Sequence, residues 1–351
     1  MAATMKDIAH RTGLGLATIS SYLNGGNVRE KNRVKIEEAI RDLHFEVNET
    51  ARGLKTNKTH TIGVVIPELN SVFCAKVIGR MEDTLRQHGY ALIICDCRTD
   101  KTREREAVEF LMKKRVDGLI NMPVDGSGKH LERFCKTGKP VVLIDREIPG
   151  LACDSVCAEN REAVKEAVKL LADHGHSCIG LVAGTQDVLT AQERLQGFEE
   201  GCREYGIPLR ESCIYSGDCT IESGVKGLKY LRDHNPDLTA VVVGNYNMTV
   251  GVLIGMNELG LTMPDQLSVI GFDNLEFARA CQPRLTILDQ PTGDIADQAA
   301  EILLQRLSGQ QGQSQKSADS KDPEDPNNQD KVLRKVRLKT SLIQGKSIKD
   351  L

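Results

Sequence analysis

The sequence contains no tryptophan, and aromatic residues make up only 4% of its 351 positions. Its hydrophobic cores must therefore be built from aliphatic side chains. No run of about 18 apolar residues occurs, which argues against a membrane-spanning helix. The first residues also lack the apolar segment of a signal peptide. We therefore expect a soluble, cytoplasmic protein with no membrane partner.

An excess of basic residues is also missing. The chain has 46 Lys and Arg against 49 Asp and Glu, a net charge of −3, which argues against a nucleic-acid partner when the chain is taken as a whole. The charges are unevenly distributed, however. Residues 1–58 hold ten basic and seven acidic residues, so this segment carries +3 and the rest of the chain −6. A basic segment attached to an acidic body is typical of a chain that binds a partner through that segment.

The eleven cysteines show no metal-binding pattern. Their number is odd, and the closest pair, Cys95 and Cys97, does not form a Cys-x-x-Cys motif. His174 and His176 have no partner pair at the spacing of zinc ligands. We expect reduced cysteines that serve as small hydrophobic residues, and neither a metal nor another cofactor.

The N-terminal segment is predicted to form three short helices. Thr4 can cap the first helix, and the third is expected over residues 31–43. Ala9, Gly13 and Ile19 have the spacing of a helix-turn-helix, in which alanine permits close approach, glycine makes the turn and isoleucine anchors the second helix. An ordinary helical hairpin can show the same spacing, so this pattern alone leaves both interpretations open.

From Thr61 onward, short apolar runs alternate with amphipathic segments. Such alternation predicts parallel strands that are buried on both faces and connected by helices. About a dozen units are too many for one sheet, so the predicted fold class is α/β with two doubly wound parallel-sheet lobes and a cleft between them. The expected strands are 62–66, 91–95, 118–120, 141–144, 179–182, 240–243 and 267–270; the expected helices are 73–88, 104–115, 162–174, 192–205 and 248–259.

A polar stretch interrupts the last part of the body. Residues 309–330 contain no large apolar side chain, which predicts a flexible surface insertion, and residues 332–343 then alternate like a returning strand. The expected domains are a helix-turn-helix head (1–46), a hinge helix and linker (47–59), a first lobe (60–159 and 289–308), a second lobe (160–288 and 331–345) and the insertion (309–330).

Several motifs occur along the chain in a fixed order. In the N-terminal part they are MKDIA at 5–9, ATIS at 17–20, Leu23-Asn24 and Asn48-x2-Ala51-Arg52-x-Leu54-Lys55-Thr56. In the body they are TIGVVIP at 61–67, RVDGLI at 115–120, Gly175-His176, RLQGF at 194–198, GFDN at 271–274 and Leu285-Thr286. Together they resemble the LacI/GalR (lactose-repressor) family over nearly the whole chain. The resemblance implies a homodimeric transcriptional regulator, not an enzyme, whose effector domain is similar to periplasmic sugar-binding proteins.

The resemblance also implies a palindromic site on double-stranded DNA, with the second helix in the major groove. Leu16 and Ala17 should then face base edges. Phosphate contacts are implied for Thr4, Lys6, Thr18, Ser20 and Asn24. For Thr18 and Ser20, a solvated helix surface is the alternative interpretation. The family commonly has Arg where this chain has Ser21, and Ser where it has Gly15. Loss of that Arg removes a guanine contact worth about 1–3 kcal/mol, so we expect a different operator.

A hinge helix is implied for residues 48–55. Asn48 can cap it, Arg52 and Lys55 can contact phosphates, and Leu54 matches a leucine that enters the minor groove and kinks the duplex. A linker leucine that packs on the body is the alternative. Gly53 weakens this short helix, which suits a segment that becomes ordered only on DNA and through which a ligand can control binding.

A small-molecule effector is implied in the cleft, at the carboxyl ends of the strands. Four residues match positions that contact a sugar-like ligand in some members: Arg194, Asn245, Asp273 and Gln290. Phe73 can stack on an apolar ligand face, and the remaining candidates are Asn70, Arg146 and Tyr246. Loop or interlobe contacts are the alternative roles for these residues.

Three departures from the family bear on the effector. Tyr246 stands where an Asp is usual, Ser71-Val72 replaces Asn-Pro, and Cys74 replaces a second aromatic residue, which makes a purine less favoured. A neutral sugar and a sugar phosphate both remain open.

Two other classes of protein fit the sequence less well. A solute-binding protein of the same architecture would not need the first 58 residues and would carry a signal peptide. An enzyme on a doubly wound fold would show a Gly-x-Gly-x-x-Gly, Walker A or Gly-x-Ser-x-Gly motif, and none occurs. Residues 342–351 lack the leucine heptads of a tetramerising coiled coil, so we expect a homodimer.

Overall fold

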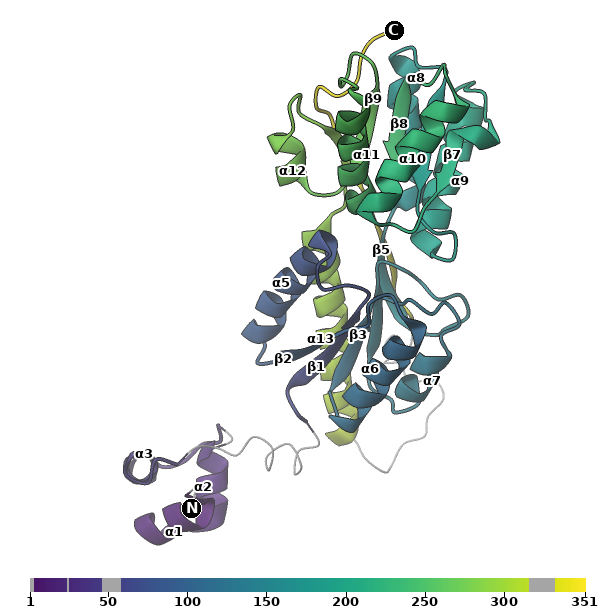
Figure 1. Ribbon diagram of the computed structural model, residues 1–351. Helices are drawn as coiled ribbons and strands as arrows, with labels where there is room; N and C mark the ends of the chain where they lie inside the picture. Colours follow the sequence, from purple (N-terminus) through teal and green to yellow (C-terminus); the bar gives the residue numbers. More distant parts are fainter. Residues whose placement is uncertain (1–2, 24, 46–57, 316–331) are drawn as a thin grey trace. The chain divides into compact units, whose positions relative to one another are not determined.

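The structure is a computed structural model that describes residues 3–23, 25–45, 58–315 and 332–351 (Figure 1). It consists of two compact units, Met1–His60 and Thr61–Leu351. Among the described residues, no helix combines the length and the apolar character needed to cross a bilayer.

The N-terminal unit contains a helix-turn-helix. Ile8, Ile19 and Ile36 are completely buried and form its core, one from each helix. Gly13 adopts the left-handed conformation (φ 68°), and its N–H donates to the carbonyl of Ala9 at 2.9 Å, so the chain turns directly into the second helix. This confirms the predicted roles of Gly13 and Ile19. The helices are α1 (Met5–Thr12), α2 (Leu16–Leu23) and α3 (Glu30–Asp42).

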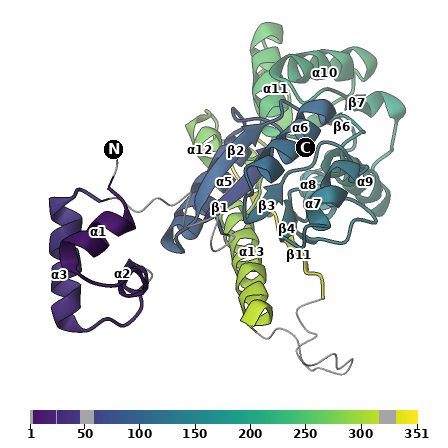
Figure 2. The same ribbon diagram turned by 90° about the horizontal axis from the view of Figure 1, so that it is seen from below.

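The first lobe is a six-stranded parallel sheet in the order β11-β5-β4-β3-β1-β2, with helices on both faces. Ile62, Val64 and Ile66 of β1 pack toward α5 and α13, whereas Val65 packs toward α6 and α7 (Figures 1 and 2). The elements are β1 (Thr61–Ile66), α5 (Val72–Gln87), β2 (Ala91–Asp96), α6 (Lys101–Lys113), β3 (Gly118–Asn121), α7 (Lys129–Cys135), β4 (Val141–Ile144), β5 (Asp154–Ala158), α13 (Thr292–Gln315) and β11 (Lys335–Leu338).

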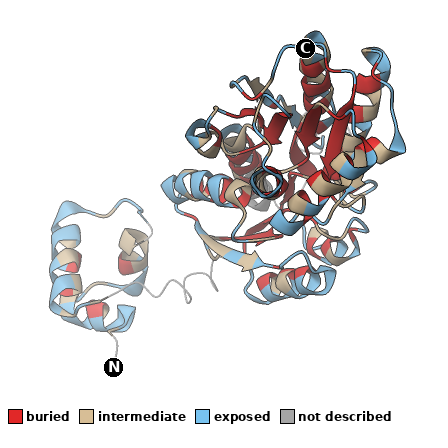
Figure 3. Ribbon diagram, turned by 45° about the horizontal axis from the view of Figure 1, so that its top comes forward, coloured by how far each residue is buried: buried red, intermediate tan, exposed pale blue. Residues whose placement is uncertain are grey.

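The second lobe repeats this plan with the strand order β12-β10-β9-β8-β6-β7, in which only β12 runs antiparallel to its neighbour. Helices α8 and α9 cover one face, and α10 and α11 cover the other. The inner strands of both sheets are largely buried, whereas the edge strands β2, β7, β11 and β12 are partly exposed (Figure 3). The elements are α8 (Asn160–Asp173), β6 (Ile179–Ala183), α9 (Leu189–Glu204), the 3-10 helix η1 (Glu211–Cys213), β7 (Ile214–Ser216), α10 (Ile221–His234), β8 (Ala240–Val243), α11 (Tyr246–Leu259), β9 (Ser268–Phe272), α12 (Leu275–Ala280), β10 (Thr286–Asp289) and β12 (Ser341–Ile343).

The predicted strands and helices of the body are all present, but the last segment differs from the expectation. The sequence predicts that residues 331–345 belong to the second lobe and that residues 332–343 form one returning strand. In the structure, β11 pairs with β5 in the first lobe, and only β12 lies in the second. Asp154 explains the difference, because its carboxylate accepts hydrogen bonds from the Arg334 N–H at 2.8 Å and from Arg306, which fixes the chain beside β5.

The predicted insertion begins later than expected. Residues 309–315 continue α13 and do not form a loop. This stretch is rich in glutamine and lacks proline, so it can extend the preceding helix. Residues 316–330, the rest of the predicted insertion, lie outside the described part of the chain.

Candidate effector pocket and DNA-binding face

A cavity of about 410 Å³ lies between the two lobes. Much of its wall is formed by residues that directly follow strands: Pro67 after β1, Asp145 after β4, Gly184 after β6, Gly244 after β8 and Asp273 after β9. The carboxyl ends of parallel strands meet at one edge of each sheet, and the two edges face each other across the cavity. The cavity is therefore where the sequence predicts the effector site.

All eight residues predicted for the effector site line this one cavity. Residues of the first lobe form one wall, with Asn70 exposed and Phe73 packed partly against the lobe's core. The complete set is Asn70, Phe73, Arg146, Arg194, Asn245, Tyr246, Asp273 and Gln290.

Arg194 of α9 is held rigidly in the floor of the second lobe. Its side chain is buried, its Nε donates to Asn160 Oδ1 at 2.8 Å, and its Nη1 donates to the Gly244 carbonyl at 2.6 Å. The guanidinium lies 3.9 Å from the centroid of the Phe272 ring, a cation–π contact. Burial lowers the pKa of Arg194, although a guanidinium still remains charged at neutral pH.

Asp273 and Gln290 form a buried pair on the same wall. The Gln290 amide Nε2 donates to both carboxylate oxygens of Asp273 at 3.0 Å. Burial raises the pKa of Asp273 to about 6, against the opposing effects of the Arg194 charge and the Gln290 hydrogen bonds. The other amide atom, Gln290 Oε1, is buried and has no hydrogen-bond partner among the described residues.

Arg146, a residue predicted for the effector site, forms a charged pair with Asp145 at the opposite wall. Arg146 Nε lies 3.0 Å from Asp145 Oδ2, and Arg146 Nη1 donates to the Pro123 carbonyl at 3.0 Å. Asp145 itself adopts a left-handed conformation (φ 69°) at the end of β4. This conformation turns the chain sharply, so the pair faces the cavity instead of continuing along the sheet.

Asn245 and Tyr246 begin helix α11. Asn245 caps the helix, because its Oδ1 accepts from the Met248 N–H at 2.8 Å while its Nδ2 donates to the Cys219 carbonyl at 3.1 Å. The Tyr246 ring meets Phe277 edge-on, with centroids 5.5 Å apart. Asn245 therefore has a structural role as well as a place in the pocket.

One polar segment of the pocket wall was not predicted from the sequence. Asp218, Thr220 and Glu222 lie between β7 and the first turn of α10. Thr220 could have indicated this segment in the sequence, because threonine is a common N-cap residue and predicts the start of a helix. In the structure, its hydroxyl accepts a hydrogen bond from the Ser223 N–H at 3.1 Å. The preceding strand has only three residues and no apolar run, which is why the segment was missed.

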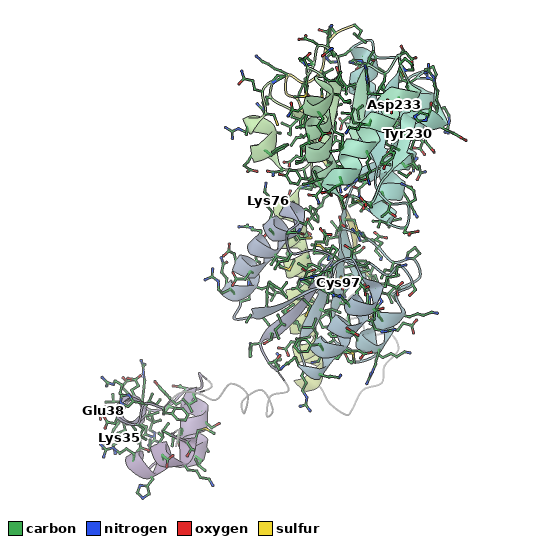
Figure 4. All side chains as sticks on the ribbon, in the orientation of Figure 1. Lys35, Glu38, Lys76, Cys97, Tyr230 and Asp233 are labelled. Atoms are coloured by element: carbon green, nitrogen blue, oxygen red, sulfur yellow. The ribbon has the colours of Figure 1, made fainter. Side chains whose placement is uncertain are left out.

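Ion pairs join the lobes outside the pocket. Lys76 of α5 binds Glu276 of α12 at 2.7 Å, and Figure 4 shows Lys76 at the end of the first lobe that faces the second. Arg337 of β11 binds Glu193 of α9 at 2.8 Å. The first pair is exposed to solvent, whereas Glu193 of the second pair is only 19% exposed.

The second helix of the head presents an apolar beginning to solvent. Leu16 is 46% exposed, and Ala17 is exposed beside it. Thr18, Ser20 and Ser21 are half-buried, and Lys6 of α1 is exposed. Thr4 caps α1, and its hydroxyl donates to the Asp7 carboxylate at 2.7 Å. The other residues predicted to contact DNA lie outside the described part of the chain: Asn24, Asn48, Arg52, Leu54 and Lys55.

The cysteines behave mostly as core residues. Seven of the eleven free thiols are buried, and burial raises the pKa of Cys74 to about 11, which keeps that thiol neutral where it packs against Met122. Within the described ranges, no three His, Cys, Asp or Glu side chains are grouped as metal ligands would be.

A helix-turn-helix unit joined to two parallel-sheet lobes around a polar cavity defines a class of protein, the DNA-binding regulators with a ligand-binding domain. Residues 4–48 match the family described as "Bacterial regulatory proteins, lacI family". Residues 59–335 match "Periplasmic binding proteins and sugar binding domain of LacI family". The chain belongs to the LacI family and is a DNA-binding transcriptional repressor with a ligand-binding domain.

Individual relatives agree with this assignment. The chain is 32% identical over 310 residues to catabolite control protein A of Priestia megaterium, covering 88% of this chain and 93% of that protein. It is 32% identical over 314 residues to the transcriptional repressor CytR of Escherichia coli (strain K12), covering 88% and 91%. The lac repressor dimer bound to operator and the anti-inducer ONPF has the same fold, with a TM-score of 0.83, 23% identity and 99% of both chains covered. These relatives are transcriptional regulators, not enzymes.

Proposed function

We propose that this chain acts in the cytoplasm as a homodimer on a palindromic operator, and that a sugar or sugar derivative bound between its lobes controls its operator affinity. One observation carries the proposal: the eight residues predicted for an effector site line a single cavity of about 410 Å³ between the lobes. A molecule that touches both walls favours one arrangement of the lobes over others.

The chemistry of the cavity suits a polyhydroxylated ligand. Asp273 and Gln290 Oε1 can accept from hydroxyl groups, and Phe73 offers an apolar face for a sugar ring. The family that matches the body is itself described as containing a sugar-binding domain.

The proposed dimer follows from the two-fold symmetry of a palindromic operator. Strand β2, at one edge of the first sheet, supports it, because Ile94 on this strand is 41% exposed. Sedimentation of the 38.6 kDa chain should give twice the monomer mass, and a monomer at micromolar concentration would contradict the dimer.

A thermal-shift screen tests the ligand site. The full chain is screened against sugars, sugar phosphates and nucleosides, and the best compound is tested on Arg194→Ala. We expect the shift to disappear, because this substitution removes the guanidinium in the pocket floor. Arg203→Ala is the matched control, since Arg203 is exposed on the same helix and should keep the full shift. A full shift in Arg194→Ala, measured against its own melting temperature, would contradict the site.

A second experiment tests the hinge. Leu54→Ala should weaken specific operator binding, because a methyl group cannot replace base stacking, while ligand binding stays intact. Leu54→Met, which keeps an apolar side chain of similar volume, should retain most of the operator affinity. If operator binding by Leu54→Ala equals that of the wild type, the hinge leucine does not act as a wedge.

A further inference from the structure

We propose that the pocket selects effectors that are neutral or carry an amine, and that it rejects phosphorylated and carboxylated ones. This selectivity rests on the proposed function of the pocket as an effector site. It concerns a choice that the sequence left open, between a neutral sugar and a sugar phosphate.

The first argument is the balance of charge around the cavity. Five carboxylates line it, those of Glu68, Asp145, Asp218, Glu222 and Asp273, and the only cationic side chains among the lining residues are those of Arg146 and Arg194. Anion sites normally combine several basic groups or backbone N–H groups. The charged side chains that line the cavity therefore sum to a formal charge of −3.

The second argument is that both guanidinium groups are already engaged by the protein. Arg194 donates to Asn160 and to the Gly244 carbonyl and stacks on Phe272. Arg146 pairs with Asp145 and donates to the Pro123 carbonyl. Reorienting either guanidinium group toward an incoming phosphate would break these contacts and leave the acceptors of the protein unpaired.

The third argument is that a buried acceptor beside Asp273 has no hydrogen-bond partner among the described residues. Gln290 is only 5% exposed, its Nε2 is used by Asp273, and its Oε1 has no partner among the described residues. Asp273 receives hydrogen bonds from the side-chain amide and the backbone N–H of Gln290, although a carboxylate has about four acceptor sites. This wall of the pocket is therefore suited to a ligand with hydrogen-bond donors, such as hydroxyl or ammonium groups.

A phosphate group offers negative charge and hydrogen-bond acceptors instead of donors. It brings a charge of about −1.5 to −2 at pH 7 and only acceptor oxygens. Such a group is repelled by the excess of carboxylates that line the cavity.

Matched ligands test the proposal by isothermal titration calorimetry with the full chain. The panel pairs pentoses, hexoses and nucleosides with their phosphates, for example glucose, glucosamine and glucose 6-phosphate, or ribose and ribose 5-phosphate; inorganic phosphate is added alone. We expect the neutral or amine form of the best scaffold to bind at least roughly tenfold more tightly than its phosphate, with a smaller difference at high salt. A phosphate that binds as tightly as its parent, or tighter, overturns the selectivity while leaving the effector site intact.

Two double variants separate local from global charge. Asp218→Asn with Glu222→Gln removes two carboxylates from the rim, so phosphorylated ligands should bind several-fold more tightly than they do to the wild type. Glu106→Gln with Glu109→Gln removes the same charge from the exposed face of α6 and should change nothing. Equal effects of both double variants would overturn the local explanation. If no compound binds the wild type, the proposed function itself fails, and the selectivity with it.

Discussion

At the scale of single residues, Asp273 combines burial with an incomplete set of partners. It is 9% exposed, and the groups that influence it are Arg194 of α9, Gln290 after β10, and Asp289 at the end of β10. Burial and Asp289 oppose its ionisation, whereas Arg194 and Gln290 favour it, and the resulting pKa is about 6. Ionisation of the Asp273 carboxyl group is therefore less favourable in the folded state than in the unfolded chain.

The pH dependence of stability tests this view of Asp273. Because its pKa is about 6 in the folded state and about 3.8 ordinarily, the native state binds more protons between these values, so the contribution of this group to stability falls as pH rises from 4 to 6. The total is on the order of 3 kcal/mol. Asp273→Asn removes this contribution, so its melting temperature should rise relative to the wild type between pH 4 and pH 7 in calorimetry.

Asp297 provides a control of opposite sign. The Arg80 guanidinium lowers the pKa of Asp297, so its contribution is present above the ordinary value and is lost in acid. Asp297→Asn should therefore lose stability relative to the wild type as pH rises through about 4. A constant difference between Asp273→Asn and the wild type from pH 4 to pH 7 would show that Asp273 is not buried as described.

At the scale of elements, helix α2 packs one face into the core of the head and exposes the residues at its start, which are predicted to contact DNA. Ile19 is completely buried between α1 and α3, whereas Leu16 is 46% exposed at the start of the helix. The helix, Leu16–Leu23, contains no Arg, Lys, Asn or Gln. Its contacts with bases must therefore rely on apolar contact and hydroxyl groups, not on bidentate hydrogen bonds.

Two substitutions in α2 should give opposite results. Ile19→Ala should destabilise the head by about 2–5 kcal/mol, because it opens a cavity in a small core. Leu16→Ala should change stability by less than about 0.5 kcal/mol, as usual for surface positions, but alter operator affinity and preference. Circular dichroism melting and fluorescence anisotropy with operator duplexes measure the two effects. Unchanged operator binding by Leu16→Ala would remove this residue from the recognition surface.

Local patterns predicted the elements well where apolar periodicity was strong. The run 62–66 could be assigned as a doubly buried strand, and Ala9, Gly13 and Ile19 indicated the helix-turn-helix correctly. The pattern over 332–343 could not show that the chain passes from one sheet to the other. That path is fixed by contacts of Asp154, which lies 180 residues away from Arg334.

In the pocket, too, the residues could be predicted from the sequence, but the tertiary contacts between them could not. The family resemblance supplied four of the eight residues expected at the effector site, and the structure brings all eight together around one cavity. The pairing of Gln290 with Asp273 and the loop at Asp218 were not predicted, because they depend on tertiary contacts between segments without a shared pattern.

At the scale of the whole molecule, the two lobes are joined by few strong contacts. The chain passes between them three times, after β5, after β10 and after β11. The ion pair Lys76–Glu276 is exposed to solvent, and exposed pairs contribute about 0–1 kcal/mol. The Arg337–Glu193 pair is partly buried. A ligand that binds residues of both lobes can therefore shift their arrangement with a modest interaction energy.

If this arrangement controls operator binding, the coupling must be reciprocal. The factor by which the ligand changes operator affinity has to equal the factor by which operator DNA changes ligand affinity, typically about 5–150-fold. Calorimetry of the best ligand with and without saturating operator, compared with anisotropy of operator with and without ligand, measures both factors. A duplex of scrambled sequence is the control and should leave ligand affinity nearly unchanged. In Leu54→Ala both factors should fall toward one, because the hinge no longer gains energy from the kinked duplex. A saturating ligand that leaves operator affinity unchanged, together with operator DNA that leaves ligand affinity unchanged, would show that the two sites are not coupled and would contradict control of operator binding by the lobes.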